Sequence, residues 1–164
     1  MGTLLHIITA DKRTFHVEFE VGQQSQTIRN MLEDLDIQQD GDGENILPLT
    51  NEDITGPIFK KALIWMEKNR GKTDFQRDYN EMNEWEKEYV NMPVSQMFPI
   101  LIAGNFLEIE GLIDLMTSAL ALQIQNNDVV EIRKIFDIED PQWTPEELQK
   151  LKEENAWAFE QKSK

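Results

Sequence analysis

The chain has 164 residues, and its 31 acidic and 16 basic side chains give a formal net charge of −15. This balance argues against nucleic acid and anionic membrane as partners, because both are bound through basic patches. The sequence has no cysteine, which excludes disulfides and thiolate metal sites. It also has no apolar run of transmembrane length, so we expect a soluble, intracellular protein.

The N-terminal residues predict a small sheet. Residues 4–8 are apolar and residues 14–19 alternate with period two, which predicts a hairpin. Residues 46–49 predict a third strand, which Pro48 confines to an edge or a strand end. His6 and His16 lie near each other if the strands pair. Two histidines fall short of a zinc site, so no metal or other cofactor is expected.

Two helices are predicted around the third strand. Ser25 is a plausible N-cap for the first, whose apolar stripe runs to Leu35. The acidic segment 36–44 lacks the glutamate that closes an EF-hand loop, so a surface loop is expected there. Pro57 suits the first turn of the second helix. The charged residues 71–83 then predict a linker.

The rest of the sequence has helical patterns. Residues 94–106 are nearly all apolar, so we expect this helix to be buried on most sides, with residues 94–98 in the core. A second apolar helix is predicted over residues 112–124. Thr144 and Glu147 form a capping box at the start of the last helix.

The short helices after residue 128 carry many apolar residues with little chain left to cover them. They either close a compact bundle or leave an apolar groove for a partner's helix. The sequence has no nucleophile elbow, Walker loop, dinucleotide fingerprint or HExxH motif, so an enzyme is not expected.

Several segments of the sequence form a recognisable set. The central one is ILIAGNFLEIEGLIDL at residues 100–115. Others lie in the early helices and the C-terminal tail: SQTIRNMLEDL (25–35), KKALIW (60–65), EIRKIFDI (131–138), WTPEE (143–147) and KEENAW (152–157). Together these segments resemble the SKP family, the S-phase-kinase-associated adaptors of SCF ubiquitin ligases.

The resemblance implies an α+β fold: a BTB/POZ-like α/β subdomain with a small three-stranded sheet, plus a C-terminal helical extension. Residues 1–70 and 84–127 would form the subdomain on either side of the linker, and residues 128–164 the F-box-binding extension. It also implies a non-catalytic adaptor that links an F-box substrate receptor to a cullin, in the cytoplasm or the nucleus. Of the two alternatives for the helices after residue 128, the resemblance therefore favours the apolar groove over a closed bundle.

The resemblance also implies two sets of site residues. Asn105 and Phe106 would contact the cullin, with Phe106 replacing a usual Tyr and Gly104 a usual Ala. The residues expected to contact the F-box are Ile113, Thr117, Leu120, Ile124, Ile132, Phe136, Ile138 and Trp157. Because of such departures the chain is expected to be a divergent paralogue.

Two other functions remain open. One is a BTB-type protein that associates with itself, and the other is a partner of F-box proteins outside cullin complexes. A homodimer is also expected when the chain has no partner.

Overall fold

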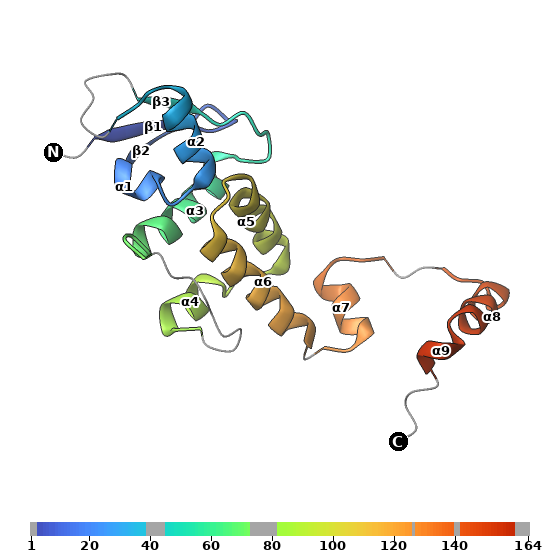
Figure 1. Ribbon diagram of the computed structural model, residues 1–164. Coiled ribbons are helices and arrows are strands. Elements are labelled where there is room, and N and C mark those ends of the chain that lie inside the picture. Colours follow the sequence, from blue (N-terminus) through green and yellow to red (C-terminus); the bar gives the residue numbers. More distant parts are fainter. Residues whose placement is uncertain (1–2, 39–44, 73–81, 126, 140–141, 160–164) are drawn as a thin grey trace. The chain divides into compact units, whose positions relative to one another are not determined.

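The computed structural model describes residues 3–38, 45–72, 82–125, 127–139 and 142–159 (Figure 1). The chain divides into two compact units, Met1–Asp128 and Val129–Lys164, and each is described by itself. Residues 39–44 of the expected acidic loop and residues 73–81 of the expected linker lie outside the described residues.

The first unit contains the three-stranded sheet that the sequence predicts. Strands β1 (Leu4–Ile8) and β2 (Thr14–Glu18) are antiparallel, and β3 (Ile46–Pro48) pairs with β1 in parallel, so the order is β2-β1-β3. Leu5 and Ile7 are fully buried on one face of β1. His6 lies opposite His16 on the other face, as the alternation requires.

The second strand is one residue shorter than predicted. It ends at Glu18, and Phe19 begins a one-turn helix, α1 (Phe19–Gly22). Gly22 lies directly against β1, where an added Cβ would be 2.6 Å from Leu5 Cδ1. Phe19 and Val21 of α1 are buried.

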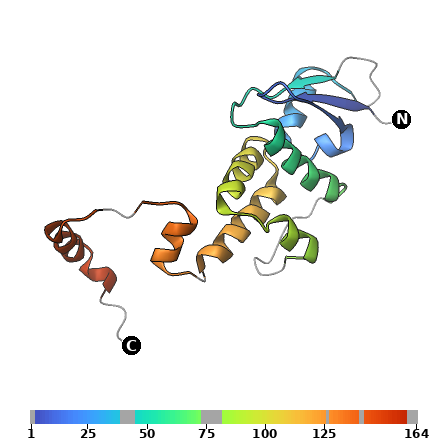
Figure 2. The same ribbon diagram turned by 180° about the vertical axis from the view of Figure 1, so that it is seen from behind.

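Helices complete the first unit: α2 (Gln26–Asp34), α3 (Gly56–Lys68), α4 (Glu84–Tyr89), α5 (Val94–Phe106) and α6 (Glu110–Gln125). Helix α5 packs between α3 and α6, and the two views show α5 and α6 side by side (Figures 1 and 2). Large side chains fill the core, including Trp65, Phe59, Met97, Leu107 and Leu112.

The second unit contains α7 (Val129–Ile135), α8 (Pro145–Glu154) and α9 (Ala156–Phe159). The predicted capping box of α8 is confirmed: Thr144 Oγ1 accepts a hydrogen bond from Glu147 N, and Glu147 Oε2 accepts one from Thr144 N at 2.8 Å. The bond from the Thr144 backbone lowers the pKa of Glu147. Among the described helices, none is long and apolar enough to span a membrane.

Two predictions about burial are wrong. Leu35 ends α2 as its C-cap and is 54% exposed, so it does not belong to the buried stripe. Helix α5 is not buried on most sides, because Phe98 and Ile102 are exposed. Met97 and Ile100 are among the side chains of α5 that are buried where this helix packs against its neighbours.

Candidate functional site

The outer face of α5 forms the first candidate surface. Phe98 and Ile102 are 39% and 47% exposed, and Asn105 is also exposed. Spacings of four and three residues place these side chains on one face of a helix. The predicted residue Phe106 is half-buried beside them. This surface therefore combines two apolar side chains with an amide, a composition typical of protein–protein contacts.

The N-terminus of α2 fixes the end of α5. The last carbonyls of a helix have no partner within it. Here Ser25 Oγ donates to Leu107 O, and Thr27 Oγ1 donates to Phe106 O at 2.6 Å. Ser25 also caps α2, since its side chain accepts from Ile28 N. The position of Phe106 thus depends on a residue 79 positions away in the sequence.

Four predicted residues lie on α6 at spacings that share one face, but they differ in burial. Leu120 is only 7% exposed and belongs to the core. Ile113 is half-buried, while Thr117 is exposed and its hydroxyl donates back to Ile113 O. Ile124 is 43% exposed, near the C-terminal end of the helix. The accessible apolar surface of α6 is therefore at that end.

The other predicted residues lie in the second unit, whose apolar side chains have little cover. No residue of α7 or α8 is buried. Ile132 and Phe136 are half-buried, Ile138 is 55% exposed and Trp157 is 72% exposed. Many large apolar groups in contact with water are typical of a surface that binds a partner. We refer to the apolar side chains of residues 129–157 as the tail surface.

The tail surface contains further residues that the sequence reasoning did not include in the site. These residues, each at least 41% exposed, are Val129, Val130, Trp143, Leu148 and Leu151. Their helical spacing was visible in the sequence. Spacing predicts that a helix face is apolar, but it does not tell whether the covering residues come from the same chain.

The remaining hollows and side-chain clusters in the described part of the chain are weak candidates for a ligand or metal site. A hollow of about 430 Å³ has a mostly polar lining that includes Glu20, Gln24 and Arg29. The rings of His6 and His16 meet edge to face with centroids 4.8 Å apart. No group of three or more His, Cys, Asp or Glu that could hold a metal occurs among the described residues.

Comparisons with known proteins agree with these features. Residues 3–71 match the tetramerisation domain of the Skp1 family, and residues 110–158 match its dimerisation domain. The E3 ubiquitin ligase complex SCF subunit sconC of Arthroderma benhamiae is 32% identical over 152 residues, which cover 88% of each chain.

Two plant proteins are similar over nearly the whole length. SKP1-like protein 11 of Arabidopsis thaliana is 32% identical over 157 residues, 96% of this chain and 97% of that protein. SKP1-like protein 4 of the same plant is 33% identical over 161 residues, 93% of each chain. Together with the three-stranded sheet, these matches confirm the predicted α+β class with a BTB/POZ-like first part.

Proposed function

The chain belongs to the Skp1 family, and from this membership we propose that it is a non-catalytic adaptor subunit of an SCF-type ubiquitin ligase. An adaptor of this kind holds a substrate receptor at one surface and a scaffold at another. Such linkage raises the effective concentration of the substrate near the ubiquitin-charged enzyme without any chemistry by the adaptor itself. We place this activity in the cytoplasm or the nucleus.

The exposed tail surface is the observation that carries the proposal. Burying a Val, Leu, Ile or Phe side chain contributes about 1.5–3 kcal/mol each. The partner that would gain this energy is the F-box segment of a substrate receptor. Ile138 and Trp157 are its main anchors, because both are large and more than half exposed. Large side chains of this kind dominate binding energy once a partner buries them.

The outer face of α5 is the surface for the cullin. Asn105 offers an amide beside the apolar groups of Phe98 and Ile102. The C-terminus of α5 is held by Ser25 and Thr27, so the surface is formed before a partner binds. A preformed surface avoids part of the ordering cost of association.

One pair of variants tests the assignment of the two surfaces. Asn105→Glu places a charge on the outer face of α5, and Gln96→Glu places the same charge on another face of this helix. The first variant is expected to lose binding to the N-terminal domain of a cullin and to keep binding to an F-box protein. The control variant is expected to keep both. If Asn105→Glu leaves cullin binding unchanged, the outer face of α5 is not the cullin surface. A wild-type chain that binds an F-box protein but no cullin would instead indicate a partner of F-box proteins outside cullin complexes.

Without an F-box protein, the exposed tail surface favours a homodimer. Sedimentation of the free chain across a dilution series detects this dimer, and addition of an F-box protein is expected to dissolve it. A dimer that persists at nanomolar concentration and in the presence of an F-box protein would instead indicate a self-associating BTB-type protein.

A further inference from the structure

The segment around α3 has a charge opposite to that of the protein. Residues 56–72 contain five Lys or Arg and one Glu, so their net charge is +4. The whole chain carries −15, so the rest of it carries −19 (−15 − 4). A surface that serves only solubility intersperses positive and negative charges. The concentration of positive charge in this one segment differs from that pattern.

Helix α3 places much of this charge on one side. Lys60, Lys61, Ile64 and Lys68 are all exposed, and their spacing places them on one face of the helix. We call these four residues the lysine face. Ile64 is 38% exposed in the middle of it. The opposite side of α3 is buried in the core, and both views show α3 at the edge of the first unit (Figures 1 and 2).

The positive charges of the lysine face are largely available. Lys60 and Lys61 form no ion pair with any described residue, and the ammonium of Lys68 lies 5.8 Å from the centre of the Trp85 ring. Arg70 outside this face is different, because it pairs with Glu18 at 2.8 Å. On the adjacent α4, Glu84 already pairs with Lys87.

Helix α4 also fixes the backbone beneath the lysine face. The hydroxyl of Tyr89 donates to Lys61 O at 2.8 Å, and Tyr89 is only 9% exposed. Burial raises the pKa of Tyr89, so its hydroxyl stays protonated and remains a donor. The backbone of α3 that carries the cations is therefore held by the buried side of the helix and by this bond from α4.

We propose that the lysine face binds a short acidic segment of a partner protein, with an apolar side chain of that segment on Ile64. The face runs from residue 60 to residue 68, about 12 Å along a helix axis, which is the length of about four extended residues. This surface contains none of the residues proposed for the F-box or the cullin, so it provides the adaptor with a third contact.

Charge complementarity favours an acidic peptide over a nucleic acid. Electrostatic interactions at physiological salt extend over about 8 Å, so a short anionic segment senses mainly the local positive charge. A nucleic acid is longer and carries a charge about every 1.7 Å along its axis, so it would also meet the acidic surface around the face. Ile64 adds a contact that a phosphate backbone does not use.

The test uses the full chain and a fluorescent peptide of Glu and Asp residues around one central Leu. Binding is followed by fluorescence anisotropy, and the contact residues by amide chemical shifts. Lys60→Glu with Lys61→Glu reverses two charges of the face. The control, Lys150→Glu with Lys152→Glu, makes the same charge change at exposed lysines of α8.

The expected result is shifts centred on α3 and about tenfold weaker binding for the α3 variant only, since each exposed charge pair contributes up to about 1 kcal/mol. Replacing the central Leu of the peptide by Ser is expected to weaken binding further. Equal losses in both double variants, or shifts outside α3, would overturn the proposal. A DNA oligonucleotide that binds the face as tightly as the peptide would overturn it as well.

Discussion

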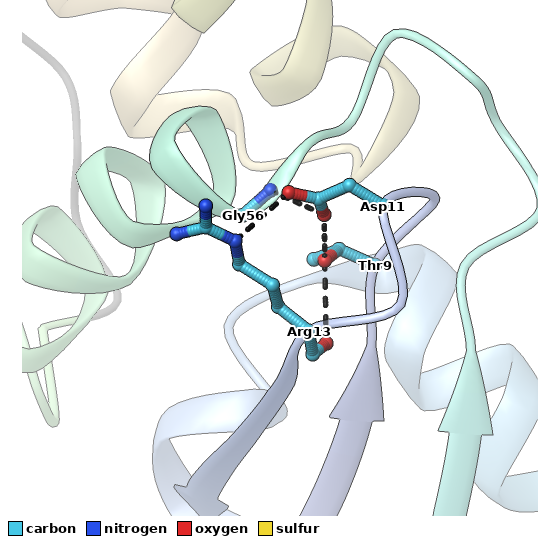
Figure 3. Close-up of polar contacts among 4 residues, drawn as sticks. All are labelled: Thr9, Asp11, Arg13 and Gly56. Carbon is cyan, nitrogen blue, oxygen red and sulfur yellow. Dashed lines mark hydrogen bonds and ion pairs between the residues drawn. The ribbon is translucent and has the colours of Figure 1, made fainter.

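Asp11 Oδ1 accepts a hydrogen bond from the backbone N–H of Gly56 at 2.8 Å, which joins the β1–β2 turn to the first residue of α3 (Figure 3). Thr55, the N-cap of α3, makes no side-chain capping bond. Asp11 therefore supplies the missing acceptor from 45 positions away. Arg13 Nε lies 3.1 Å from the same carboxylate.

We expect Asp11→Ala to lower the unfolding temperature of the first unit. The substitution leaves the Gly56 N–H without its acceptor and removes a negative charge from the start of α3, where the helix dipole favours one. Asp53→Ala is the control, since the Asp53 carboxylate makes no hydrogen bond with the described residues and is exposed. Equal unfolding temperatures for the two variants would contradict the capping role.

The same carboxylate predicts a pH dependence. The hydrogen bond from Thr9, followed by the bond from Gly56 N, lowers the pKa of Asp11. A lowered pKa in the folded state adds stability above the usual carboxyl pKa, and this stability is lost as the pH falls through the folded value. Urea unfolding across the acid range should therefore show a difference between wild type and Asp11→Ala that shrinks with decreasing pH. A constant difference would exclude this linkage.

Ser25→Ala is expected to destabilise the first unit by about 1–3 kcal/mol, because it leaves the Ile28 N–H without its acceptor and leaves Leu107 O with only the 3.4 Å bond from Thr27 N. Ser25 is fully buried, and its hydroxyl serves both Ile28 N and Leu107 O. Thr144→Ala removes an exposed N-cap, so it should only speed amide exchange in α8. Urea unfolding and hydrogen exchange measure the two effects. A cost for Ser25→Ala below that of an ordinary exposed cap would show that the Leu107 contact contributes little.

Replacement of two glycines by alanine is expected to change the free energy of unfolding in opposite directions. At Gly104 in α5, the nearest atom to an added Cβ is Leu112 Cδ2 at 3.4 Å, an ordinary contact. Gly104→Ala should stabilise the chain by about 0.5–1 kcal/mol through helix propensity. At Gly22 the added Cβ would lie 2.6 Å from the buried Leu5, so Gly22→Ala should cost about 1–3 kcal/mol. Urea unfolding distinguishes these signs, and the same sign for both would contradict the packing.

Variants of Trp157 and Leu120 are expected to differ in their effects on F-box binding and on the free energy of unfolding. Trp157→Ala removes a side chain that is 72% exposed, so it should weaken F-box binding and leave the unfolding free energy of the free chain nearly unchanged. Leu120→Ala creates a cavity in the core and should cost about 2–5 kcal/mol. Calorimetric titration with an F-box protein and urea unfolding give both quantities. Unchanged F-box binding by Trp157→Ala would remove this residue from the proposed interface.

The sequence by itself determined the local structure and the family. The hairpin, the Ser25 cap and the Thr144–Glu147 capping box depend on residues close in the chain, and all three are confirmed. The segment of residues 100–115 is also continuous in the sequence, so its resemblance to the family could be seen without the structure.

Only the tertiary structure decided which apolar residues are covered. Phe98 and Met97 are neighbours in an apolar helix, yet Phe98 is 39% exposed and Met97 is buried, because the elements packed against α5 cover Met97 and leave Phe98 partly exposed. Leu120 and Ile124 differ in the same way on α6. Periodicity describes the faces of a helix but not the elements packed against them. Burial and the Asp11–Gly56 contact depend on those distant elements.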